Sequence, residues 1–135
     1  SDHGGFEYKA KIIDYLKEHN FEYEDMGTYT TESCDYPIIA QKVAKKVVSG
    51  EADKGILICG TGIGMSIAAN KVKGIRAALC SDTFSAKATR AHNNSNILCL
   101  GQRAIGECLA LDIVDVWLHT EFEGGRHQRR IDEIE

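Results

Sequence analysis

The sequence predicts an α/β domain in which a three-layer, doubly wound, Rossmann-like parallel sheet is flanked by helices. Three short apolar runs, GILIC, RAALC and NILCL, have the length and composition of buried strands. Segments with helical spacing of apolar residues separate these runs, as they do in βαβ units. Strands that are apolar throughout are typical of parallel sheets, because helices cover both faces. We expect residues 1–135 to form one domain.

In the first half of the chain, apolar residues recur at helical spacing over 6–19 and predict the first helix. Residues 21–26 are expected to form a short strand, and a polar loop follows. Pro37 stands where a helix can begin, and an apolar stripe follows it as far as Val48. A turn over 50–54 then leads into GILIC, the first of the three apolar runs.

In the second half, helices and strands are expected to alternate. Asp82 is placed to cap the helix that follows it. The apolar spacing predicts helices over 65–72, 82–92 and 106–119, strands over 76–80 and 96–100, and a short last helix in the tail.

The chain opens on the polar turn Ser1-Asp2-His3-Gly4-Gly5, which leads directly into a predicted helix. In a doubly wound domain, such a turn normally follows the carboxyl end of a strand. We therefore expect a first strand of a few residues ahead of Ser1, which the sequence in hand does not include.

Composition and charge narrow the classes of function. A formal net charge of −4 argues against broad binding to nucleic acid or to anionic membranes. No apolar run is long enough to cross a bilayer, and no signal peptide is recognisable. The five cysteines are odd in number and lack C-x-x-C spacing, which favours reduced thiols and a cytoplasmic location.

The glycine-rich segment 59–64, CGTGIG, joins a buried strand to a helix, which is where open α/β sheets bind ligands. Glycines let the backbone approach a ligand closely, and free amides favour an anion. A Walker A loop is excluded because Met65 and Ser66 follow Gly64. The dinucleotide motif requires a glycine where Met65 stands, although Asp82 falls near the expected acidic position. The segment is therefore predicted to cradle an anion, with a nucleotide as the weaker alternative.

Cys59, at the edge of this loop, has two explanations. Cysteine is among the most buried residue types, so position alone favours a space-filling role. Its place at a strand end, beside amides that favour a thiolate, makes it a candidate reactive group as well. Cys80 and Cys99 also lie at or near strand ends but lack a glycine loop, and we assign them to the core.

Two further histidines and a basic cluster need an explanation. His3 and His92 lie in polar turns, where a histidine is usually structural or exposed. No H-x-x-x-H or similar pair supports a metal site, so we expect none. The tail groups Arg126, His127, Arg129 and Arg130 could simply form a solvated helix start. Arginine forks nonetheless suit phosphate oxygens, and a local basic cluster in an anionic protein favours a small phosphorylated ligand.

Seven blocks of sequence occur in a specific order: SDHGG, DYP (35–37), GILICGTGIGMSIAANK, GIRAA, HNNSN, LGQR and EGGRHQRR. Together they resemble the type B ribose-5-phosphate isomerases, a family that also includes allose-6-phosphate and galactose-6-phosphate isomerases. The resemblance spans nearly the whole chain. It implies an aldose–ketose isomerase that needs neither a metal nor an organic cofactor, and it also implies a strand ahead of Ser1.

The resemblance implies a role for each group. Cys59 matches the base that moves a proton between the first two sugar carbons through a cis-enediolate, where some relatives use serine with a glutamate further along. His92 matches the residue that opens the furanose ring. Asp2 would assist ring opening or bind sugar hydroxyls, and Tyr36 would pack against the sugar. The anion hole for the enediolate would comprise Gly60, Thr61, Gly62, Ile63, Gly64 and Asn93.

The resemblance also implies a phosphate clamp made of His3, Arg103, Arg126 and Arg130. In the family, the residues matching His92, Asn93 and Arg103 come from the neighbouring subunit. The active unit would therefore be a homodimer with shared sites, or a tetramer. Because His92 and Arg103 flank one predicted strand, we also expect them to project from the same edge of the sheet.

Three alternatives remain open at the level of sequence. The substrate could be allose 6-phosphate or galactose 6-phosphate, although galactose-6-phosphate isomerases use two different subunits. The presence of Cys59, His92 and the arginines in one chain favours a self-sufficient homodimer. A non-catalytic sugar-phosphate binding domain would not need Cys59 or His92. A nucleotide-dependent oxidoreductase would need the glycine that is missing at position 65.

Overall fold

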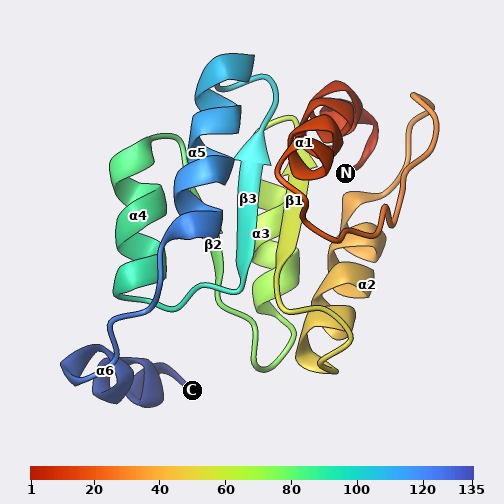
Figure 1. Cartoon of the computed structure of the whole chain (residues 1–135). Helices are drawn as coiled ribbons and strands as arrows, with labels where there is room; N and C mark the ends of the chain where they lie inside the picture. The colour runs from red at the N-terminus through yellow and green to blue at the C-terminus, as the bar shows by residue number, and fades with distance from the viewer.

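A parallel three-stranded sheet forms the middle layer of the chain in the computed structural model, which describes residues 1–135 (Figure 1). The strands lie in the order β1 (Gly55–Cys59), β3 (Ile97–Gly101) and β2 (Ala77–Leu79). In the register of the sheet, Cys59 lies opposite Gly101, and Leu79 lies opposite Cys99. The carboxyl ends of all three strands therefore meet at one edge of the sheet.

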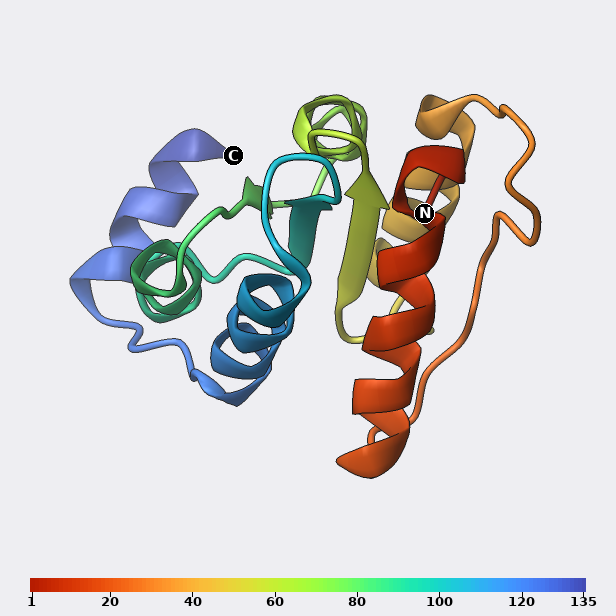
Figure 2. The same ribbon diagram turned by 90° about the horizontal axis from the view of Figure 1, so that it is seen from above.

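Helices cover both faces of the sheet, and the view from above separates the layers (Figure 2). One face carries α2 (Tyr36–Val48) and α3 (Ile63–Asn70). The other face carries α1 (Phe6–Glu18), α4 (Thr83–Ala91) and α5 (Glu107–His119). A 3-10 turn, η1 (His3–Gly5), precedes α1, and α6 (Arg126–Ile134) lies outside the layers beside the end of α4. None of these helices combines the length and apolar character needed to span a bilayer.

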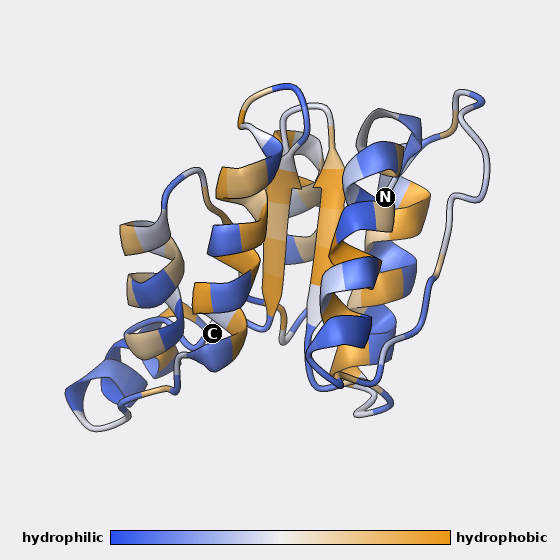
Figure 3. Cartoon of the chain, turned by 45° about the horizontal axis from the view of Figure 1, so that its top comes forward, coloured by the Kyte–Doolittle hydropathy of each residue, from blue (hydrophilic) through white to orange (hydrophobic).

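The core has two halves, one on each face of the sheet, and the strands supply both. Along β1, Leu57 packs against α2 and α3, whereas its neighbour Ile58 packs against α1 and α5. Successive strand residues point to opposite faces, so a strand covered on both sides must be apolar throughout. Figure 3 shows the resulting continuous apolar band along β1 and β3. The α/β, doubly wound class predicted from the three apolar runs is confirmed.

Asp82 caps α4 as predicted, since its carboxylate accepts a hydrogen bond from the Ser85 amide at 2.6 Å. Cys80 and Cys99 are buried in the core, also as predicted. The helices and strands otherwise agree with the predicted order and differ from it by a few residues at their ends.

The predicted strand over 21–26 is wrong, because this segment is extended but pairs with no strand. A groove of about 520 Å³, lined by side chains of α1, β1 and α2, separates it from the edge of β1. Only its ends are bonded to other backbone: the Phe21 amide donates to the Leu16 carbonyl, and the Thr28 amide just beyond it donates to the Ser1 carbonyl. Without a neighbouring backbone to pair with, an extended segment cannot become part of a sheet.

We predict that Leu57→Ala lowers the free energy of unfolding by about 2–5 kcal/mol, because it leaves a cavity in a core that cannot collapse around it. Leu57 is fully buried between the sheet and two helices. The measurement is urea denaturation followed through the fluorescence of Trp117, the single tryptophan. Leu109→Ala is the control, since Leu109 is exposed on α5, and should change stability by no more than about 0.5 kcal/mol. Equal losses in the two variants would contradict this description of the core.

Candidate active site

The loop between β1 and α3 holds Cys59 against backbone amides. The Gly62 N–H points at the sulfur of Cys59, with a nitrogen–sulfur distance of 3.1 Å. Only 6% of Cys59 is exposed, at the carboxyl edge of the sheet. The Thr61 hydroxyl accepts a hydrogen bond from the Ile63 amide at 3.2 Å. The Cys59 thiol is therefore buried at the carboxyl edge of the sheet and accepts a hydrogen bond from a backbone amide.

The backbone of the loop requires glycine at position 62. Gly62 has φ of 79°, in the left-handed region, where it ends the loop and begins α3. A Cβ there would lie 2.5 Å from the Leu79 side chain and 2.9 Å from the backbone of Leu100. Neither β2 nor β3 could accept that contact without shifting. The tight turn that directs the Gly62 amide back to Cys59 therefore depends on the absence of a side chain.

Tyr36 covers the loop from the start of α2. A Cβ on Gly64 would lie 2.6 Å from the Tyr36 ring, so the ring rests directly on the backbone at the beginning of α3. Tyr36 itself remains partly exposed at 40%. The ring therefore lies beside the loop and open to solvent.

Asp2 and His3 lie against the same loop. Asp2 is buried, and its carboxylate accepts a hydrogen bond from the Gly4 amide at 2.9 Å. Its own amide donates to the Ile58 carbonyl at the end of β1, at 3.3 Å. The Nδ1 atom of His3 accepts a hydrogen bond from the Cys34 amide at 3.2 Å, which fixes the ring orientation. The opening turn thus lies against the start of the loop at Gly60, with the Asp2 carboxylate beside Gly4 and the His3 ring directed toward Cys34.

Arg103 does not lie with His92, contrary to the expectation drawn from their positions around one strand. The Arg103 amide donates to the Gly60 carbonyl at 2.9 Å, and its Cδ lies 3.5 Å from the place of a Cβ on Gly60. The reason is the direction of β3. Residues that precede the strand lie at the amino edge of the sheet, and residues that follow it lie at the carboxyl edge.

His92 and Asn93 follow α4 and therefore lie at the amino edge, opposite to Cys59 (Figure 1). A strand of five residues spans about 13 Å, so His92 and Cys59 of one chain cannot act on adjacent atoms of one sugar. The basic residues Arg126 and Arg130 of α6 accompany His92 rather than Cys59. The four residues of the expected phosphate clamp are thus divided, with His3 and Arg103 at one edge and the two α6 arginines at the other.

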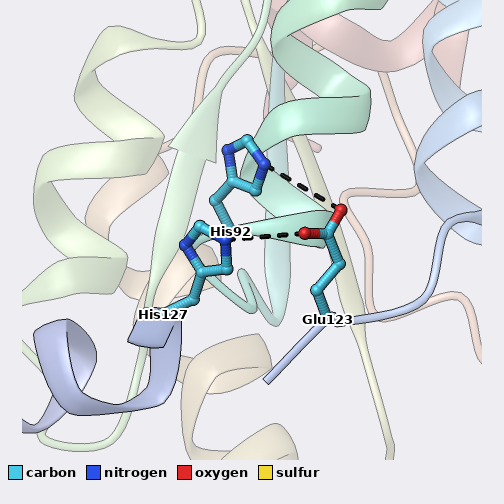
Figure 4. Close-up of side chains that lie close together, drawn as sticks. All are labelled: His92, Glu123 and His127. Carbon is cyan, nitrogen blue, oxygen red and sulfur yellow. Dashed lines mark ion pairs between the residues drawn. The ribbon is translucent and has the colours of Figure 1, made fainter. Parts of the chain in front are cut away.

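His92 has two neighbours that the sequence did not connect with it, Glu123 and His127 (Figure 4). The Nε2 atom of His92 lies 4.0 Å from one carboxylate oxygen of Glu123, and Nε2 of His127 lies 3.5 Å from the other. Burial lowers the pKa of His127, and His92 and Arg126 lower it further. Glu123 and His127 have an i,i+4 spacing. His92 lies 31 positions before Glu123, and no local sequence pattern predicts that the two residues meet.

The other buried thiols are unsuited to base chemistry. Burial raises the pKa of Cys80 to about 11, and it also raises the pKa of Cys99 far above its ordinary value. Both thiols therefore stay protonated at neutral pH. Cys59 is the buried cysteine to which a backbone amide is directed.

Comparison with known proteins gives the class of the chain. A family model described as Ribose/Galactose Isomerase matches residues 1–134. Ribose-5-phosphate isomerase B of Escherichia coli is 52% identical over 98% of this chain and 89% of its own length. The solved structure of Clostridium thermocellum ribose-5-phosphate isomerase B has a TM-score of 0.98 at 57% identity, covering 99% of this chain and 90% of that one.

A second solved structure, ribose-5-phosphate isomerase B of Mycoplasma genitalium with bound ribulose-5-phosphate, has a TM-score of 0.96 at 46% identity. It covers 99% of this chain and 90% of that one. The chain therefore belongs to the ribose/galactose isomerase family, and it is an isomerase. This finding confirms the resemblance seen in the seven blocks of sequence and removes the nucleotide-dependent oxidoreductase from consideration.

We predict that Gly62→Ala lowers the free energy of unfolding by about 1–3 kcal/mol, because alanine must adopt a left-handed backbone and its Cβ meets two strands. Gly60→Ala is the matched control. A Cβ on Gly60 meets only Arg103 at an ordinary distance, so its stability should change by no more than about 0.5 kcal/mol. Urea denaturation of both variants, side by side, is the measurement. If Gly62→Ala proves as stable as Gly60→Ala, the loop does not require the left-handed turn.

Proposed function

We propose that this isomerase interconverts ribose 5-phosphate and ribulose 5-phosphate, with Cys59 as the base. The observation that carries the proposal is the buried Cys59 thiol with the Gly62 amide 3.1 Å from its sulfur, at the carboxyl edge of the sheet. Family membership supports the reaction type, and the names of its relatives support the five-carbon substrate.

In the proposed reaction, the Cys59 thiolate removes the proton on C2 of the open-chain aldose. The electrons move to the aldehyde oxygen, and a cis-enediolate forms. The Cys59 thiol then returns the proton to C1, and the proton of the C2 hydroxyl passes to O1, so that C2 becomes the ketone and C1 carries the hydroxyl. The developing negative charge on oxygen requires donors nearby, and we assign this role to the amides of the 60–64 loop and the Thr61 hydroxyl. No cofactor is required, because the proton acceptor and the charge-stabilising donors both belong to the chain.

The cyclic form of the substrate must be opened first, and His92 is the group that we assign to this step. A neutral imidazole can accept the proton of the anomeric hydroxyl and return a proton to the ring oxygen near neutral pH. In one chain, His92 and Cys59 lie at opposite edges of the sheet. Both groups can act on one sugar only if a second copy of the chain supplies one of them.

We therefore propose a symmetric homodimer in which the amino edge of one chain faces the carboxyl edge of its partner. In a two-fold interface, each chain both donates and receives the same set of residues. Each site would then combine the Cys59 loop, Asp2, His3, Tyr36 and Arg103 of one chain with His92, Asn93, Arg126 and Arg130 of the other. This arrangement also reunites the divided phosphate clamp around one phosphate.

An exposed apolar surface supports the dimer. Phe84 is 82% exposed at the start of α4, and Ile67 is 58% exposed on α3. Ile63 of α3 and Leu79 of β2, an edge strand, are exposed as well. Asn70 joins α3 to β2 through two hydrogen bonds to Ala77, so these side chains belong to neighbouring elements. Apolar groups gathered in this way are typical of a surface that a partner covers.

A six-carbon sugar phosphate is the second candidate substrate, because the matching family model also names galactose isomerases. A comparison of kcat/KM for ribose 5-phosphate, allose 6-phosphate and galactose 6-phosphate separates the two. A non-catalytic sugar-phosphate binding domain would turn over none of them, and it would give no reason for the Gly62 amide to face Cys59.

We predict that Cys59→Ala reduces kcat with ribose 5-phosphate by at least about 100-fold, because the base is lost. The affinity for inorganic phosphate, measured by competition, should stay nearly unchanged because the proposed clamp is intact. Cys108→Ala is the control, since Cys108 is an exposed cysteine on α5, and it should retain full activity. Substantial turnover by Cys59→Ala would remove Cys59 from the mechanism.

Subunit complementation tests the shared sites. Cys59→Ala and His92→Ala should each be inactive on the cyclic aldose phosphate, yet a mixture that exchanges subunits should recover about a quarter of wild-type activity. Half of the random dimers are mixed, and one of the two sites in each mixed dimer has both wild-type residues. Native mass spectrometry counts the mixed dimers. Mixed dimers without activity would show that Cys59 and His92 do not meet across a subunit boundary.

A further inference from the structure

The carboxylate of Glu123 faces the edges of two imidazole rings. Figure 4 shows its two oxygens facing the Nε2 atoms of His92 and His127, one oxygen to each ring. The carboxylate is brought there by its backbone, because the Glu123 amide donates to the carbonyl of Ala91, the residue next to His92, at 3.0 Å. The segment before α6 is thus joined to the end of α4 at the point where His92 begins its turn.

The two imidazole rings are stacked, with centroids 4.4 Å apart and planes inclined by only 14°. His127 is buried and forms a wall along one face of His92, whose own side chain is about half exposed. Stacking therefore limits how the His92 ring can turn. The free edge of His92, which carries Nδ1, is the edge that does not face Glu123.

The ring geometry decides between a metal ion and a proton at this cluster. The donor atoms of His92, Glu123 and His127 all lie within 4.8 Å of one another, which is close enough to consider a metal. A metal bound to imidazole lies in the ring plane, along the nitrogen lone pair, and two nearly parallel rings have no such point in common. A carboxylate has two oxygens and can face the N–H group of each ring separately. The ion-pair distances of 4.0 and 3.5 Å fit a carboxylate that orients the two imidazoles through its charge.

The charges around His92 come from three elements. Glu123 supplies the negative charge, from the segment that precedes α6. Arg126, His127 and Arg130 belong to α6. Arg90 of α4 is already engaged, since its guanidinium donates to the carbonyls of Thr120 and Ser95 and to the Asn94 side chain. In a setting otherwise basic, Glu123 is the one carboxylate that faces His92.

We propose that Glu123 is a positioning residue for ring opening, whose negative charge 4.0 Å from Nε2 favours the Nε2–H tautomer of His92 and leaves Nδ1 free to receive the sugar proton. The inference rests on the proposed function. In the step, the proton of the anomeric hydroxyl moves from O1 to Nδ1, and the C1–O4 bond breaks with its electron pair on O4. The protonated His92 then gives a proton to O4. The carboxylate of Glu123 stabilises the imidazolium that exists between these two transfers.

The test compares Glu123→Gln with Glu121→Gln, which removes the same charge from an exposed position of the same segment. Glutamine keeps the shape of Glu123 but removes its charge, and its amide nitrogen can face Nε2 and favour the opposite tautomer. We expect kcat for ribose 5-phosphate to fall about tenfold, a part of what acid–base catalysis contributes. Turnover of ribulose 5-phosphate, which cannot form a furanose, should change less than twofold, and Glu121→Gln should match the wild type. A loss of activity that is equal in both reaction directions would assign Glu123 a structural role and overturn the inference.

Nitrogen-15 NMR of the histidine rings tests the positioning without any assay of turnover. We expect His92 to be the Nε2–H tautomer in the wild type and a mixture of tautomers in Glu123→Gln. The same tautomer in both proteins would overturn the inference even if activity fell. Conversely, a wild-type protein that isomerises no sugar phosphate would contradict the proposed function, whereas the NMR result would still decide whether Glu123 controls the His92 ring.

Discussion

Close contact between backbone segments at the carboxyl edge of the sheet determines the geometry of the candidate site. Gly101 ends β3, and a Cβ on it would lie 2.5 Å from the carbonyl oxygen of Thr61. The Cys59 loop therefore rests directly on the end of β3, with no side chain between them. From that contact follow the turn at Gly62, the direction of its amide toward Cys59 and the bond between the Arg103 amide and the Gly60 carbonyl.

The same parallel sheet explains why the candidate site residues of one chain are divided between its carboxyl edge and its amino edge. Each helix of a doubly wound fold returns the chain from the carboxyl edge to the amino edge, so residues that follow strands and residues that follow helices lie at opposite ends. Cys59 ends a strand and Arg103 follows one, whereas His92 follows a helix. On the proposed mechanism, chemistry on one sugar needs these groups together, so the division within the chain and the proposed pairing of two chains have a single cause.

Much of the fold could be predicted from the sequence, because local patterns determine it. The apolar runs GILIC and NILCL and the cap at Asp82 predicted β1, β3 and the start of α4. The strand predicted over 21–26 was wrong because a strand depends on a neighbouring strand as well as on its own residues. The contacts of Glu123 and His127 with His92 were not predicted, nor was the separation of Arg103 from His92, because these positions depend on how the α6 segment and β3 are oriented in space.

The placement of His92 and Cys59 at opposite edges has a thermodynamic consequence. On the proposed arrangement, a bound sugar phosphate contacts two chains at once, so the ligand binds the pair and has no complete site on a single chain. Linkage then requires that ligand binding strengthens association, by the same factor by which association strengthens ligand binding. The substrate would act as part of the interface, and the concentration of the sugar phosphate would set how much of the protein is assembled.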